Sequence, residues 1–242
     1  GKHIGKNVLS FDLPSVLVGP CTEEGAQFPP DATFLITGGA GGFGWEVAKW
    51  LATQGVRNLA LLSRSGPSAD VAVEIETLRG EGVSIHDVRA DVTCQADVDA
   101  ALQRIRDELP PLRGIIHAAM VLEDEFLVDL DVERFNKVLD PKMVGAWNLH
   151  RATLDDPLEH FVCFSSYSAV VGAARQANYN AGNVFLDILA HHRRGLGLPA
   201  LSINWGALVG AGFVDRNKKT ADYLEMVGIK PLYVHEALDA LG

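Results

Sequence analysis

The chain has 242 residues, of which 48% are hydrophobic, and a formal net charge of −10 at pH 7. This length allows one sizeable core, and the negative charge argues against nucleic acid or an anionic membrane as a general partner. No apolar run approaches the roughly 18 residues of a membrane span, and the N-terminus lacks the apolar core of a signal peptide, so we expect a soluble cytoplasmic protein.

From about residue 33, short apolar runs alternate with helical segments. The runs are apolar almost throughout, which is typical of parallel strands covered on both faces. We expect Gly55 and Gly80 to end the first two helices and Pro141 to split the fourth into two. The alternation predicts an α/β fold, a doubly wound parallel sheet (Rossmann fold) with helices on both faces. The expected strands are residues 33–37, 58–63, 83–91, 114–118, 160–165 and 200–205, and the expected helices are residues 45–54, 69–79, 95–109, 132–153 and 178–194.

The two ends of the chain depart from this repeat. Residues 1–30 are predicted to be an N-terminal tail or linker left from another module, in which residues 3–11 could form a strand. Residues 31–242 are predicted to be the main domain. Within it, residues 211–231 precede a short helix at 234–241 and are placed to act as a lid over a substrate.

A glycine-rich turn at residues 37–44 follows the first expected strand and opens the first helix. Glycines in this context let the backbone approach a pyrophosphate, and the helix N-terminus offers unpaired N–H groups and a favourable dipole. The turn therefore predicts a dinucleotide site. The residues expected to bind the cofactor here are Thr37, Gly38, Gly41, Gly42, Phe43 and Gly44.

The second expected strand ends in Ser63 and Arg64. A site that prefers NAD places a carboxylate near this position to hold the ribose 2′-hydroxyl. An arginine suits a 2′-phosphate instead, because its planar fork can bind phosphate oxygens in pairs. NADPH is therefore the expected cofactor, and a solvated surface role for Arg64 is the alternative.

Four side chains form a candidate catalytic set: Lys142, Ser166, Tyr179 and Asn183. Reduction of a ketone by hydride needs an acid that protonates the developing alkoxide, and a tyrosine can serve if a nearby ammonium lowers its pKa. A second hydroxyl, from Ser166, would hold the carbonyl. Ser166 ends the fifth strand and Tyr179 begins the following helix, so both are expected at the carboxyl edge of the sheet, where a cofactor binds.

A metal site is not expected. Cys21, Cys94 and Cys163 are odd in number and have no CxxC spacing, so they predict neither a zinc site nor a disulfide framework. His191 and His192 are adjacent on an expected helix and point about 100° apart, which disfavours shared ligation.

The spacing of Gly38, Gly42 and Gly44 after Thr37 resembles that of short-chain dehydrogenases. Most of these enzymes carry a lysine four residues after the tyrosine, where this chain has Asn183, and an asparagine on the earlier helix, where it has Lys142. This exchanged arrangement resembles the ketoreductase domains of type I polyketide synthases and animal-type fatty acid synthases. The resemblance covers residues 32 to about 240 and also rests on the sequences at residues 62–66, 114–119, 141–150, 164–166 and 176–183.

The resemblance implies NADPH-dependent reduction of a 3-ketoacyl thioester carried on the phosphopantetheine arm of an acyl carrier protein. Tyr179 would be the proton donor and Ser166 the hydroxyl that binds the carbonyl. Lys142 would lower the pKa of Tyr179 and bind the nicotinamide ribose, and Asn183 would support the lysine and a proton relay. Asp91 and Val92 would contact the adenine ring, and Ala118 and Ala119 would line the adenine ribose side.

The resemblance also implies neighbours and a stereochemical outcome. Residues 1–11 look like the end of an enoylreductase domain, and a structural ketoreductase subdomain would belong to the same synthase. Ketoreductases that give the D (3R) alcohol share a Leu-Asp-Asp element, and this chain has Leu122, Glu123 and Asp124 there. Those that give the L alcohol carry a tryptophan eight residues before the tyrosine, where this chain has Val171. Met120, where many bacterial modular domains have glycine, is similar to iterative synthases.

Two other interpretations compete with this one. A free-standing short-chain dehydrogenase would act on a small alcohol or sugar, but the tail at residues 1–30 and the exchanged lysine and asparagine argue against it. A catalytically inactive scaffold subdomain is the other alternative; such relics usually lose the glycine turn and the tyrosine, and this chain retains both.

Overall fold

The computed structural model describes residues 28–210 and 230–241. Its centre is a six-stranded sheet with the order β3-β2-β1-β4-β5-β6, in which every neighbouring pair is parallel. This order reverses between β1 and β4, as in doubly wound folds, where ligands bind at the carboxyl ends of the strands beside the reversal. The strands are β1 (Thr33–Thr37), β2 (Asn58–Ser63), β3 (Ser84–Arg89), β4 (Leu112–His117), β5 (His160–Ser166) and β6 (Leu201–Trp205).

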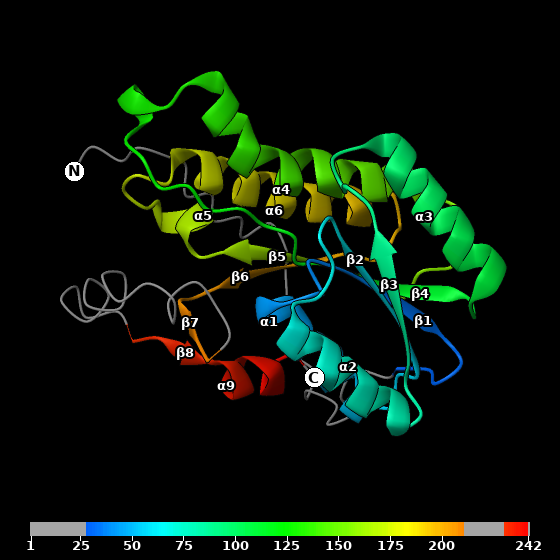
Figure 1. The fold of residues 1–242 in the computed structure, drawn as a ribbon. Helices are drawn as coiled ribbons and strands as arrows, with labels where there is room; N and C mark the ends of the chain where they lie inside the picture. Colours follow the sequence, from blue (N-terminus) through cyan, green and yellow to red (C-terminus); the bar gives the residue numbers. More distant parts are fainter. Residues whose placement is uncertain (1–27, 211–229, 242) are drawn as a thin grey trace, which may run out of the picture.

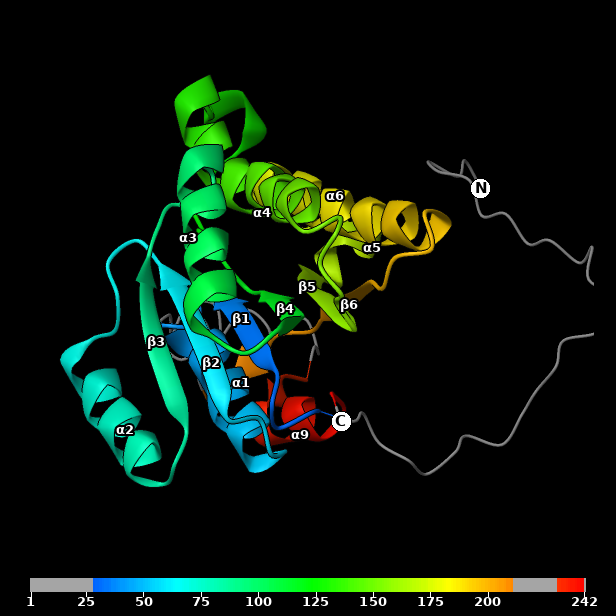
Figure 2. The ribbon, with the colours of Figure 1, turned by 90° about the vertical axis from the view of Figure 1, so that its right-hand side faces the viewer.

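Helices cover both faces of the sheet and give three layers (Figure 1; Figure 2). One face carries α1 (Gly42–Thr53), α2 (Ala69–Gly80) and α9 (Val234–Asp239). The other carries α3 (Gln95–Glu108), α4 (Val132–Ala152) and α6 (Ala177–Gly195). The predicted Rossmann fold is therefore confirmed.

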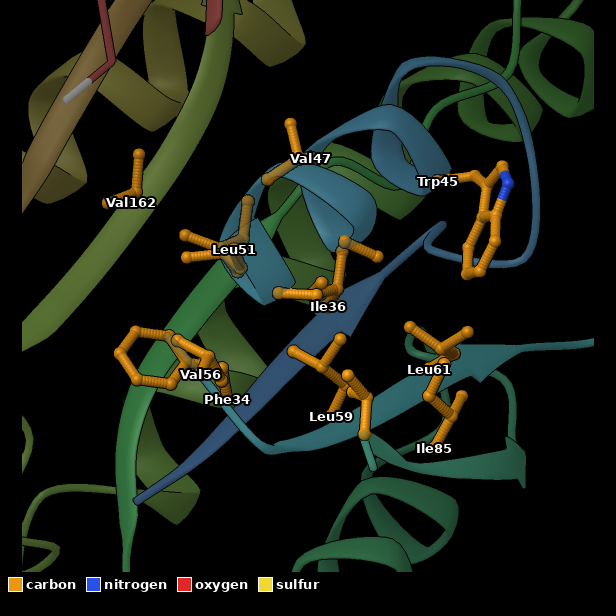
Figure 3. Close-up of a cluster of buried hydrophobic side chains, with 14 of the residues drawn as sticks. Phe34, Ile36, Trp45, Val47, Leu51, Val56, Leu59, Leu61, Ile85 and Val162 are labelled. Carbon is orange, nitrogen blue, oxygen red and sulfur yellow. The ribbon is translucent and has the colours of Figure 1, made fainter. Parts of the chain in front are cut away.

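The sheet separates two buried apolar clusters. Along β1, Phe34 and Ile36 face the first cluster, together with side chains of α1 (Figure 3), while Leu35 between them faces the second. Successive side chains of a strand point to opposite faces, so a strand with helices on both sides is buried along its length, as all five residues of β1 are. Each fully buried Leu, Ile or Phe contributes about 1.5–3 kcal/mol. From the helices, the second cluster takes Leu102, Leu149 and Leu186.

Two expectations about helix ends are wrong. The fourth helix is continuous through Pro141. Proline leaves only one carbonyl, that of Lys137, without its helical donor, and Lys137 is exposed, so the lost bond lies at the surface. In α2, Gly80 lies inside the helix, and Gly82 takes the left-handed conformation after it, with φ 86°. Gly55, with φ 98° after α1, is confirmed as the residue that ends its helix.

The remaining bounds match the expectations within a few residues; β4, for example, begins at Leu112, two residues earlier than expected. Three short elements were not predicted: η1 (Leu127–Asp129), α5 (Ser168–Val171) and a two-stranded parallel sheet of β7 (Leu208–Val209) and β8 (Leu232–Tyr233). The predicted strand at residues 3–11 and most of the predicted tail (1–30) and lid (211–231) lie outside the described residues. The division at residue 30 and the lid stay predictions. No helix in the described parts of the chain is long and apolar enough to cross a membrane.

Candidate active site

The glycine turn joins β1 to α1 at the carboxyl edge of the sheet. Gly38 and Gly42 have φ values of 70° and 54°, a region that favours glycine. A Cβ on Gly38 would lie 3.0 Å from the carbonyl oxygen of Ala118, and one on Gly44 would collide with the carbonyl of Gly38. The first turn of α1 carries no acidic side chain. The turn thus presents a compact, uncharged helix N-terminus, which fits the pyrophosphate of a dinucleotide.

Thr37 links this turn to the end of β4. Its Oγ1 accepts a hydrogen bond from the Ala119 N–H at 3.3 Å and lies 2.8 Å from Nδ1 of His117. Burial, reinforced by the positive charge of Lys142, lowers the pKa of His117 to about 3. His117 is not among the predicted site residues, although a histidine that ends an apolar strand beside the cofactor turn is itself a signal.

The turn after β2 contains the residues expected to choose the cofactor. Ser63 Oγ accepts a hydrogen bond from the Gly66 N–H at 2.9 Å, and the guanidinium of Arg89 bonds to the carbonyl of Ser65 and packs against Gly66. Arg64 is exposed beside this turn. A preference of this turn for a 2′-phosphate over a ribose hydroxyl stays a prediction.

Asp91 and Val92 follow β3 at the same edge. The Asp91 carboxylate accepts hydrogen bonds from the N–H and hydroxyl of Thr93 at 2.9 and 2.8 Å, so it fixes the loop. Val92 is buried, and its carbonyl accepts a hydrogen bond from Asn148 Nδ2 at 3.0 Å. A Cβ on Gly145 would lie 2.8 Å from Cγ1 of the Val92 side chain. The loop is therefore anchored on α4. Contact of these residues, or of Ala118 and Ala119, with an adenosine stays a prediction.

The four candidate catalytic residues come from α4, β5 and α6, and they meet at this edge. Lys142 is 2% exposed; its Nζ donates to the Phe164 carbonyl at 2.8 Å and lies 5.2 Å from the centre of the Tyr179 ring. The two helices can approach because Gly182 has no side chain: a Cβ there would lie 3.1 Å from Cβ of Lys142. Burial lowers the pKa of Lys142 to about 8, since a low dielectric disfavours the charged form.

The expected lowering of the tyrosine pKa is not found in this arrangement. Burial raises the pKa of Tyr179, and the neighbouring side chains of Asn183 and Ser166 act in the opposite direction. The Lys142 ammonium donates to the Phe164 carbonyl and lies over the ring, and it does not offset the effect of burial. Asn183 donates its amide to the backbone carbonyl of Tyr179 at 2.9 Å, and its buried Oδ1 has no hydrogen-bond partner among the described residues.

One of the two segments expected to control stereochemistry is hydrogen-bonded to the start of α6. The Asp124 carboxylate accepts from Nε2 of Gln176 at 3.0 and 3.2 Å, three residues before Tyr179. Glu123 instead forms ion pairs with Arg134 and Lys137 of α4, so it holds the segment in place. Leu122 is half-buried, and Val171, at the end of α5, is 67% exposed.

A family comparison decides the class of protein. Residues 32–210 match the model of the KR domain. The chain belongs to the KR domain family. It is 39% identical over its whole length to the highly reducing polyketide synthase PKS6 of Gibberella zeae and 35% identical to the lovastatin diketide synthase lovF of Aspergillus terreus. It spans only 10% and 9% of these two relatives.

Solved structures agree with this assignment. The KR domain is similar to the ketoreductase from the first module of phoslactomycin biosynthesis in a Streptomyces species, with 36% identity and a TM-score of 0.84 over 90% of this chain and 50% of that one. It is also similar to A-type ketoreductases from a modular polyketide synthase, with 35% identity and a TM-score of 0.83 over 93% of this chain and 47% of that one. The KR domain is thus an oxidoreductase domain of the polyketide synthase type, and the resemblance read from its motifs is confirmed.

Proposed function

We propose that this KR domain uses NADPH to reduce a 3-ketoacyl thioester, carried by an acyl carrier protein, to the 3-hydroxyacyl thioester. The observation that carries the proposal is the buried Lys142 ammonium over the Tyr179 ring, beside Ser166. A lysine is almost never buried without a specific role or partner. Its burial here, reached across two helices and made possible by Gly182, supports an active reductase over an inactive scaffold.

NADPH would supply the hydride, and side chains of this domain would bind the carbonyl oxygen and donate the proton. Tyr179 donates its phenolic proton to the oxygen of the carbonyl as negative charge develops there. Ser166 donates a hydrogen bond to the same oxygen and fixes its position. The positive charge of Lys142 favours the phenolate that Tyr179 becomes. Asn183, on the same face of α6 as Tyr179, would support Lys142 and the return of the proton.

The binding of NADPH is assigned to the glycine turn for the pyrophosphate and to Ser63 and Arg64 for the 2′-phosphate. The turn after β2 has no carboxylate to repel that phosphate, and Arg64 is free at the surface to reach it. Asp91, Val92, Ala118 and Ala119 would enclose the adenosine. The preference for NADPH over NADH rests on Arg64 and is testable separately from the reaction.

The remaining partners follow from the kind of protein in which the relatives occur. The matching relatives are polyketide synthases about ten times the length of this chain. We therefore assign the substrate to the phosphopantetheine arm of an acyl carrier protein. We also assign an enoylreductase domain and a structural ketoreductase domain to the same polypeptide. The D (3R) alcohol is the proposed product, because Leu122 and Asp124 are retained and Val171 stands where a tryptophan marks the L class.

The direct test is reduction of a 3-ketoacyl N-acetylcysteamine thioester, followed by loss of NADPH absorbance, with a simple ketone as the matched control. The expected result is turnover of the thioester and little turnover of the ketone, with the D alcohol predominant by chiral chromatography. Preference for simple ketones or alcohols would indicate a free-standing dehydrogenase. NADPH binding without turnover would indicate a scaffold, and an excess of the L alcohol would overturn the assignment of Leu122 and Asp124.

A further inference from the structure

The last strand of the described sheet, β6, bears a polar network directly beneath the candidate catalytic residues. Asn204 Nδ2 donates to three acceptors: Asp187 Oδ2 at 3.0 Å, Ser165 Oγ at 3.1 Å and the backbone carbonyl of Ser166 at 3.1 Å. All three partners can accept, which fixes the orientation of the amide. A single side chain on β6 thus contacts both β5 and α6, which lie beside it in Figure 1.

The network continues from Asn204 to the tyrosine helix. Ser165 Oγ, which accepts from Asn204, donates in turn to the backbone carbonyl of Asn183 at 3.2 Å. Asn183 then donates its amide to the carbonyl of Tyr179 at 2.9 Å. The path from Asn204 therefore reaches Ser166 in one step and Tyr179 in three.

Asp187 anchors the network. It lies two turns after Tyr179 on α6, and its second oxygen accepts from Ser202 Oγ at 2.6 Å. Ser202 and Asn204 are alternate residues of β6, so both side chains project to the same face of the strand. Two neutral donors on one carboxylate hold the edge strand against α6, and the bond that Asn204 itself makes to Asp187 fixes the direction of its amide toward Ser165 and Ser166.

We infer that Asn204, anchored by Asp187, is a positioning residue that sets the relative places of Ser166 and Tyr179 for hydride reduction. It acts through the Ser166 backbone and through Ser165. The inference rests on the proposed function and extends it to a residue outside the family's catalytic set. Its physical basis is that hydroxyls must be held at hydrogen-bond distance from the reacting oxygen, and small displacements lower the rate sharply.

The decisive variant is Asn204→Ala, because Asn204 is exposed and its truncation leaves the core intact. In the thioester assay, kcat should fall about 10-fold, the loss expected for one net hydrogen bond, while KM and NADPH affinity stay within about twofold. Ser202→Ala is the matched control: it removes a bond to Asp187 from the same strand but touches neither Ser165 nor Ser166, and should retain wild-type kcat. Wild-type kcat in Asn204→Ala would overturn the inference.

A double-mutant cycle separates positioning from general loosening of the strand. Ser165→Ala and Asn204→Ala interrupt the same path, so the double variant should be no slower than the slower single variant. Independent, multiplying losses would mean that Asn204 does not act through Ser165. If Asn204→Ala fails to fold, Asp187→Asn, which keeps the shape and removes the anchoring charge, should still lower kcat with unchanged NADPH affinity. A wild-type rate in that variant would also overturn the inference.

A titration without cofactor or substrate keeps this test independent of the proposed function. Tyr179 ionisation can be followed by ultraviolet absorbance, with Tyr179→Phe as the subtracted reference. Its neighbours are the charged Lys142 and Asp124 and the polar Ser166 and Asn183. Because the last two lower the pKa of Tyr179, Asn204→Ala should raise it and Ser202→Ala should not. An unmoved titration would refute positioning even if the protein reduces thioesters; a moved titration in a protein that does not reduce them would refute only the proposed function.

Discussion

The buried ammonium of Lys142 should make the stability of the KR domain depend on pH. Burial lowers the pKa of Lys142 from 10.5 to about 8. Between these values the unfolded chain binds more protons than the folded one, so stability rises with pH. Over the whole pH range in which Lys142 titrates, the free energy of unfolding rises by roughly 3 kcal/mol. Roughly 2 kcal/mol of this rise falls between pH 7 and 9.5.

Lys142→Met isolates this effect, because methionine keeps an unbranched apolar stem and never carries a charge. The free energy of unfolding in urea would be measured for both proteins at pH 7 and 9.5. From pH 7 to 9.5, the free energy of unfolding of the wild type should rise by about 2 kcal/mol more than that of the variant. The other titrating groups are present in both proteins, so their contributions cancel. A difference between the two proteins that does not change with pH would mean that Lys142 is solvated, which would refute its proposed role beside Tyr179.

Three other substitutions test the site. Tyr179→Phe should lower the rate of thioester reduction at least about 10²-fold with NADPH affinity by fluorescence nearly unchanged; retention of a tenth of the rate would contradict the acid assignment. Arg64→Ala should weaken NADPH binding about 10- to 150-fold and leave NADH binding unaffected, whereas equal losses would reduce Arg64 to a structural role. Gly182→Val should lower the free energy of unfolding in urea by about 1–3 kcal/mol and displace the Lys142 side chain. Gly195→Ala, on the same helix but with open space around its Cβ, should do neither. Equal effects of the two substitutions would show that Gly182 is not needed for helix packing.

The layers and the sheet were predictable because each depends on local pattern. Runs such as residues 33–37 are apolar at their three central positions and buried from end to end, which is typical of a strand covered on both faces. The helix through Pro141 was not predictable in the same way, because its continuity depends on where the freed carbonyl of Lys137 lies. Lys137 is an exposed residue, and a sequence does not indicate which side of a helix faces solvent when the pattern is interrupted.

The candidate catalytic residues were predictable for a different reason. Their chemistry is demanding and their order along the chain matches a known family, so Lys142, Ser166 and Tyr179 could be named before their positions in space were known. Asn204 could not, because it acts through partners from other elements, and the contact of His117 with Thr37 could not be foreseen for the same reason. Thr37 and His117 meet only when β1 pairs with β4, and Asn204 meets Ser165 only when β5 pairs with β6.

The exchange of lysine and asparagine makes sense once α4 and α6 are seen together. A lysine one turn after the tyrosine would reach the phenol along its own helix; here Asn183 fills that place and bonds to the Tyr179 carbonyl. Lys142 reaches the same ring from the neighbouring helix, and Gly182 is the residue that allows α4 to come close enough. The reaction requires a positive charge near the phenol, and it is indifferent to which helix provides it. Because the two routes need different side chains at the helix crossing, a lysine restored at position 183 would meet Lys142 in the same buried space. The resulting pair of buried like charges should lower the pKa of both, so Asn183→Lys alone should impair reduction, while pairing it with Lys142→Asn should recover part of the lost rate. Full activity in the single variant would show that Lys142 and the residue at position 183 do not share one site.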